Sequence, residues 1–63
     1  MTPTLLVFRD GHQQEVGNYA ITGTKLIVLG EKTQKIQLTD LDLNATAKAN
    51  QDRGVDFKMP NQS

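Results

Sequence analysis

His12 is the residue best suited to acid–base or metal chemistry, because it is the only histidine in the 63-residue chain. It follows Asp10 and Gly11 in a predicted hairpin turn, and Glu15 is the nearest group that could orient its ring. Nucleophilic catalysis would also need a side chain such as serine or cysteine beside this base. The chain has no cysteine, and its single serine, Ser63, is the last residue. Turns commonly carry exposed polar residues, so this pattern favours a structural His12 over a catalytic or metal-binding one.

Asp40, Asp42 and Asn44 have the spacing of the first three oxygen ligands of an EF-hand calcium loop. The remainder of such a loop does not match, because Ala45 occupies the position of the turn glycine and Gln51 that of the bidentate carboxylate. Together with His12, these three residues form a candidate polar site. The sequence predicts no cofactor and no enzymatic activity.

The charges of the chain are balanced, with seven Lys and Arg against seven Asp and Glu. Nucleic-acid binders usually concentrate basic residues on one face or stripe, whereas the lysines here are scattered among acids. The longest uninterrupted apolar run, residues 26–29, is far shorter than the roughly 20 residues that span a bilayer. We therefore expect neither nucleic-acid binding nor membrane insertion.

A chain of this length forms at most one domain, and no cysteine is present to stabilise it with a disulfide. We expect an N-terminal tail over residues 1–3, a single small domain over 4–59 and a disordered tail over 60–63. A chain without thiols suits reducing and oxidising compartments equally, so composition leaves the localisation open.

Runs of β-branched, aromatic and aliphatic residues predict an antiparallel β-meander of about four strands. Asp10-Gly11 is typical of a two-residue hairpin turn and should end the first strand. Gly17 should bend the second strand, since glycine weakens a strand interior. The expected strands cover residues 4–8, 13–21, 26–29 and 35–38.

One helix is predicted after the strands, beginning near residue 40 and ending at Arg53. Thr39 with Asp42 resembles a capping box, and Gly54 fits the glycine that follows a helix. Residues 41–49 also alternate at the period of a strand, but their alanines and both caps favour the helix. Residues 55–58 are compatible with a short fifth strand. The predicted fold class is α+β: a β-meander, either open or curled as in SH3-like barrels, followed by one helix.

Side-chain parity predicts that the sheet has two apolar faces. With two-residue turns, Leu6 would pair with Glu15 in the first hairpin. One face would then hold Leu6, Phe8, Tyr19, Ile21, Leu26 and Val28, and the other Leu5, Val7, Val16, Ile27 and Leu29. A single alanine-rich helix can cover only one face, so we expect barrel closure or a partner to cover the second.

A series of short motifs runs through residues 5–60. They are Asp10-Gly11-His12, Asn18-Tyr19-Ala20-Ile21, Ile36-Gln37-Leu38, Asp40-Leu41-Asp42-Leu43, Ala45-Thr46, Ala49-Asn50 and Arg53-Gly54-Val55-Asp56-Phe57. This pattern resembles an uncharacterised short domain at the C-terminal ends of bacterial proteins, many of them exported and from soil bacteria. The resemblance implies a terminal module of a larger protein outside the cytoplasm, and it implies no activity or ligand. More loosely, the chain is similar in fold to SH3-like and Sm-like barrels, which are also meanders with an Asp-Gly hairpin after the first strand.

These observations favour a non-catalytic module for protein interaction or self-association, for example as a homodimer. The predicted interaction surface is the second apolar face, which consists of Leu5, Val7, Val16, Ile27 and Leu29. Its burial against a second copy, or against the remainder of a parent protein, would contribute several kcal/mol at roughly 25 cal/mol per Å². The alternative is a small β-barrel that binds nucleic acid or another ligand, which salt-dependent binding would reveal.

Overall fold

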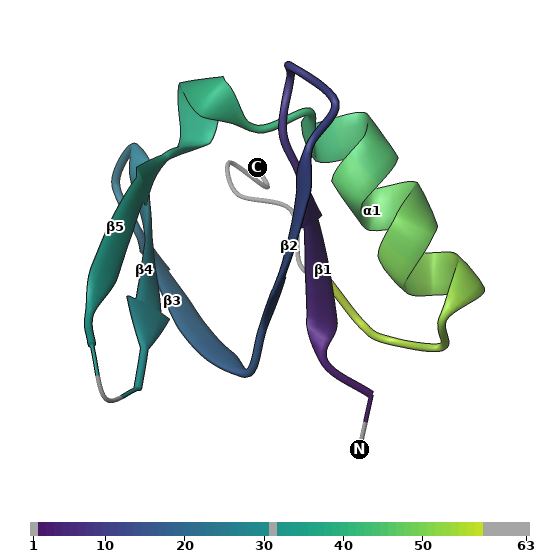
Figure 1. Cartoon of the computed structure of the whole chain (residues 1–63), viewed down its shortest axis with the longest axis horizontal. Coiled ribbons are helices and arrows are strands. Elements are labelled where there is room, and N and C mark those ends of the chain that lie inside the picture. Colours follow the sequence, from purple (N-terminus) through teal and green to yellow (C-terminus); the bar gives the residue numbers. More distant parts are fainter. Residues whose placement is uncertain (1, 31, 58–63) are drawn as a thin grey trace.

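The computed structural model describes residues 2–30 and 32–57, and it confirms the α+β class predicted from the sequence. Five short antiparallel strands form two sheets and are followed by one helix (Figure 1). In chain order the elements are β1 (Thr4–Val7), β2 (Gln13–Val16), β3 (Asn18–Thr22), β4 (Lys25–Leu29), β5 (Gln34–Gln37), the 3-10 helix η1 (Leu38–Asp40) and α1 (Leu43–Asp52). The described strands form no closed barrel, so the meander is open.

Gly17 divides the expected second strand, residues 13–21, into β2 and β3, which gives five strands instead of four. In Figure 1 these two strands meet at the foot of a V, whose arms are the β1–β2 sheet and the β3–β4–β5 sheet. Val16 before the bend and Tyr19 after it both contribute to the core, so the alternation of side chains changes at the glycine. The predicted bend is therefore confirmed, and it is sharp enough to separate the sheets.

The first hairpin has a three-residue loop, residues 9–11, where the sequence predicted a two-residue turn. The Phe8 N–H donates to the His12 carbonyl at 2.9 Å, and the Gly11 N–H donates back to the Phe8 carbonyl at 3.0 Å. Gly11 has a φ of +98°, a conformation that glycine adopts without steric cost. Such loops combine a tight turn with a left-handed glycine and are the next most common hairpin connection.

This longer loop shifts the register of β1 and β2 by one residue. Leu6 pairs with Gln14, and the predicted pairing of Leu6 with Glu15 is wrong. Because side chains alternate along a strand, a shift of one residue exchanges the two faces of β2. Val16 consequently lies on the same face as Leu6 and is buried in the core at 4% exposure.

The second hairpin has the predicted two-residue turn, with Thr22 paired with Lys25. Tyr19 pairs with Val28 and Ile21 with Leu26, so the inner face predicted for this part of the sheet is confirmed. Both arms of the V supply the core. The buried residues are Leu6, Val16, Leu26, Ile36, Leu41 and Phe57, and the half-buried residues packed on them are Phe8, Tyr19, Ile21, Val28, Leu38, Leu43 and Ala47.

The helix starts later than predicted, because residues 38–40 form η1 and Leu41 is extended. Asp42 caps α1, and its carboxylate accepts the Ala45 N–H at 3.1 Å, so a cap at Thr39 is wrong. The predicted end is confirmed: Gly54 has a φ of +76° and donates to the Gln51 carbonyl at 3.1 Å. Residues 55–57 form no strand, and residue 58 of the expected fifth strand lies outside the described residues.

We expect Gly11→Ala to lower the free energy of unfolding by about 1–2 kcal/mol, since an L-residue is strained at positive φ. Gly17→Ala is the control, because its φ is not positive and a Cβ there meets no atom within 4 Å. Urea unfolding of both variants measures the difference. Equal losses would contradict the assignment of Gly11 as the residue that permits the three-residue loop.

Candidate functional site

His12 lies at the end of the first hairpin loop, where its contacts are structural. Its ring stacks on Phe8 with centroids 4.0 Å apart and planes inclined by 13°. Its Nδ1 bonds the Asp10 carboxylate, which also accepts the His12 backbone N–H at 2.9 Å. Glu15, the expected orienting group, instead pairs with Arg53 at 2.8 Å. The bonds from His12, that of its backbone N–H first, hold the pKa of Asp10 below its usual value.

The hairpin loop and the end of η1 line an open hollow of about 360 Å³. Its lining residues are Phe8, Arg9, Asp10, His12 and Asp40. The fold thus places two members of the candidate polar site, His12 and Asp40, around one hollow. Within residues 2–30 and 32–57, no three His, Asp or Glu side chains gather closely enough to hold a metal ion.

The remaining polar candidates begin α1. Asp42 is its N-cap, and Asn44 is exposed in its first turn, while Asp40 ends η1. The spacing of these residues matched part of a calcium loop, but the three residues span the junction between η1 and α1.

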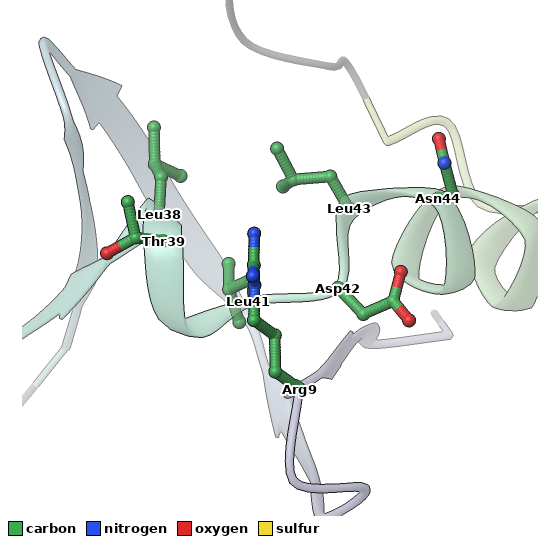
Figure 2. A pocket seen from close by; sticks show the side chains of 7 residues that line it. All are labelled: Arg9, Leu38, Thr39, Leu41, Asp42, Leu43 and Asn44. Carbon is green, nitrogen blue, oxygen red and sulfur yellow. The ribbon is translucent and has the colours of Figure 1, made fainter.

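A larger hollow of about 590 Å³ lies between η1 and α1. It is lined by Arg9, Leu38, Thr39, Leu41, Asp42, Leu43 and Asn44. Figure 2 shows Leu38 and Leu43 directed to the same side of the chain, with Arg9 crossing Leu41 between them and Asp42 pointing away. All of its polar lining residues are exposed. Ligand sites usually bury most of their ligand, so this hollow has the character of open surface.

The structure separates the five residues of the predicted interaction surface. Val16 lies in the core, because the register of the first hairpin places it on the same face as Leu6. The prediction that it belongs to the interaction surface is therefore wrong. Leu5 and Val7 are half-buried on β1, next to α1. Ile27 and Leu29 remain on the outer face of the β3–β4–β5 sheet, on the central strand.

This outer face has a small apolar centre, which we call the outer patch and define as Ala20, Ile27 and Leu29. Ala20 pairs with Ile27 across β3 and β4, and opposed residues share a face. Leu29 is 48% exposed and is the only large apolar side chain so exposed among the residues described. In Figure 1, α1 lies on the opposite side of the β1–β2 sheet, so the helix does not cover this patch.

Thr46 and Asn50, which the sequence analysis named only as parts of two short motifs, are completely buried. The Asn50 amide accepts the Leu5 N–H and donates to the Leu5 carbonyl, both at 2.7 Å. The Thr46 hydroxyl accepts the Val7 N–H at 3.0 Å and donates to the Val7 carbonyl at 3.1 Å. We call these four contacts the edge bonds. One indication of this burial was present in the sequence: Thr46 and Asn50 are four positions apart, on the helix face that also holds Leu43 and Ala47.

Comparison of the chain with protein-family models, with curated proteins and with solved structures finds no match. The resemblance to bacterial C-terminal domains therefore stays a prediction. In the described part of the chain, no helix is both long enough and apolar enough to cross a membrane.

We expect acid to destabilise the fold partly through Asp10. Because folding lowers the pKa of Asp10 from its ordinary value of 3.8, the carboxylate stabilises the folded state above that value. This contribution disappears as the pH falls through the lowered pKa. Asp10→Asn should therefore flatten the dependence of unfolding free energy on pH between about 2 and 5, relative to the wild-type chain. Urea unfolding over this pH range measures the slope, and a slope equal to that of the wild type would contradict the role of Asp10.

We expect Asn50→Asp to destabilise the protein by about 3 kcal/mol at pH 7. The new carboxylate still accepts the Leu5 N–H, but it cannot donate to the carbonyls of Leu5 and Thr46, which Asn50 bonds at 2.7 Å each. The loss should shrink at low pH, since a protonated carboxyl is uncharged and can donate one bond. Asn44→Asp, exposed in the same helix, is the matched control, and urea unfolding at pH 4 and 7 measures both. A loss independent of pH would contradict this account.

Proposed function

We propose that this domain is a non-catalytic module for protein interaction or self-association, which docks through the outer patch. The observation that supports this proposal is the exposure of Leu29 on the central strand of the β3–β4–β5 sheet, beside half-buried Ile27. Single exposed apolar residues are common, but Leu29 lies beside another large apolar residue on a sheet face that α1 leaves open. The partner is a second copy of the chain or another part of a larger bacterial protein, as the resemblance implies.

The size of the patch predicts a weak, reversible contact. Full burial of one leucine or isoleucine side chain contributes about 1.5–3 kcal/mol, whereas association costs at least about 4 kcal/mol of lost freedom. Ile27 is already half-buried in the monomer, so its further gain is smaller. Such a small net gain is typical of transient interfaces, which bury less than about 1,200 Å² of accessible surface in total.

A contact through the sheet face agrees better with these residues than a contact through the edge of β5. That strand exposes Lys35 and two glutamines. Lysine on an edge strand is a common means of preventing strand pairing between molecules. Lys35 also pairs with Ile27 and so flanks the outer patch, but the patch has an exposed leucine, Leu29, which the β5 edge lacks.

Sedimentation of the isolated chain at rising concentration tests the self-associating form. We expect the mass-average size of the wild-type chain to rise, and Leu29→Lys to abolish the rise, because the lysine charge would have to be desolvated in the contact. Gln51→Lys adds the same charge at an exposed position of α1, away from this sheet face, and should leave the association intact. A wild-type chain that stays monomeric at millimolar concentration contradicts self-association.

A further inference from the structure

α1 takes the place of a neighbouring strand along the outer edge of β1 (Figure 1). The edge bonds satisfy both backbone groups of Leu5 and of Val7, which β1 directs away from β2. Four residues of helix rise about 6 Å, and two residues of strand about 6.6 Å, so side chains four apart can follow alternate residues of a strand. Thr46 and Asn50 have this spacing.

Backbone pairing continues the same edge toward the hairpin. The Val7 carbonyl also accepts the Asp42 N–H at 2.9 Å, and the Arg9 N–H donates to the Asp40 carbonyl at 2.9 Å. Phe8 and Leu41 form the antiparallel bridge between these two bonds. The edge is thus closed by a short strand-like segment and then by helix side chains.

The attachment of α1 to this edge is mainly polar. Its only buried residues are Thr46 and Asn50, and its apolar contribution to the core comes from half-buried Leu43 and Ala47. When α1 is released, its hydrogen bonds to β1 are replaced by bonds to water, so little net stability is lost with each one. The exposure of a large buried apolar side chain costs much more. Release of α1 therefore removes less apolar packing than release of a helix with buried leucines would.

The edge that α1 closes is also the one most able to associate. β1 has the sequence Thr-Leu-Leu-Val, with no charge and no proline, so it lacks the residues that usually protect an exposed edge strand. The outer strand of the other sheet, β5, carries Lys35 and needs no such cover. We infer that β1 is a masked strand-acceptor site, which α1 blocks in the monomer and which β1 of a second copy occupies when α1 is released.

The geometry fixes the register of that pairing. Release of α1 frees both backbone groups of Leu5 and the N–H of Val7, and it leaves the Val7 carbonyl with one of its two bonds, the one from the Asp42 N–H. An antiparallel partner must place its own Leu5 and Val7 opposite these groups. Leu5 therefore pairs with the partner's Val7, and Leu6 faces the partner's Leu6 across a two-fold axis. The pairs of Leu5 with Val7 and of Leu6 with Leu6 are apolar, and Thr4 faces Phe8, so no like charges oppose one another.

The test removes the edge bonds without changing side-chain size. In Thr46→Val combined with Asn50→Leu, we expect dimerisation at least tenfold tighter than in the wild-type chain, measured by sedimentation, with the amides of Leu5 and Val7 protected from exchange in the dimer. Asn44→Leu makes the same type of change at an exposed position of α1 and should behave as wild type. A folded double variant that stays monomeric overturns the inference.

Two further substitutions in the double variant identify the surface used. Val7→Lys should restore the monomer, because it places a charge in the proposed strand pair. Leu29→Lys should leave the dimer intact, because the outer patch is not involved; loss of the dimer here would assign it to the proposed docking face instead. Association that Val7→Lys leaves unchanged overturns the inference, and this outcome is independent of the fate of the proposed function.

Hydrogen exchange of the wild-type chain gives a second test that does not require a stable variant. If α1 opens separately, the amides of Leu5 and Val7 exchange faster than that of Leu6, which pairs with β2 in the other direction. We expect at least a tenfold difference in rate. Equal protection of these three amides would mean that α1 leaves only on global unfolding, and the masked site would then be refuted.

Discussion

The outer edge of β1 is the constraint on which the rest of the structure depends. Buried backbone N–H and carbonyl groups must be hydrogen-bonded, and none of the described strands lies beside those of Leu5 and Val7. Thr46 and Asn50 supply the missing partners, so α1 must run alongside β1 at hydrogen-bonding distance. Asp42 then starts the helix next to Val7, and the chain after the helix returns to place Phe57 in the core.

A helix used in this way is unavailable as a cover for a sheet face. The core is filled from inside the V, by side chains of both sheets together with Leu41 and Phe57. The outer face of the β3–β4–β5 sheet keeps Leu29 exposed as a result. The proposed docking patch and the masked edge of β1 are thus two consequences of one arrangement: the helix closes an edge and leaves a face open.

The polar residues that could have carried chemistry have structural contacts instead. Asp42 caps α1, Asp10 binds both the backbone and the ring of His12, and Asn50 bonds three backbone groups. Asn50 bonds Leu5, 45 residues earlier in the chain, whereas the side-chain contacts of Asp10 and Asp42 lie within three residues of each. This explains why spacing alone, as in the Asp40 to Asn44 segment, suggested ligands where the chain forms helical turns.

The sequence by itself determined the features that depend on neighbouring residues: the strands of the meander, the bend at Gly17, the turn after β3 and the glycine that ends α1 at Gly54. Tertiary structure decided the rest. A one-residue difference in the first hairpin loop moved Val16 from the predicted interaction surface into the core, and local turn preferences do not resolve two-residue from three-residue loops. The burial of Thr46 and Asn50 depends on β1, 39 and 45 residues earlier in the chain, so helical periodicity could place them on one face but could not show what that face would meet.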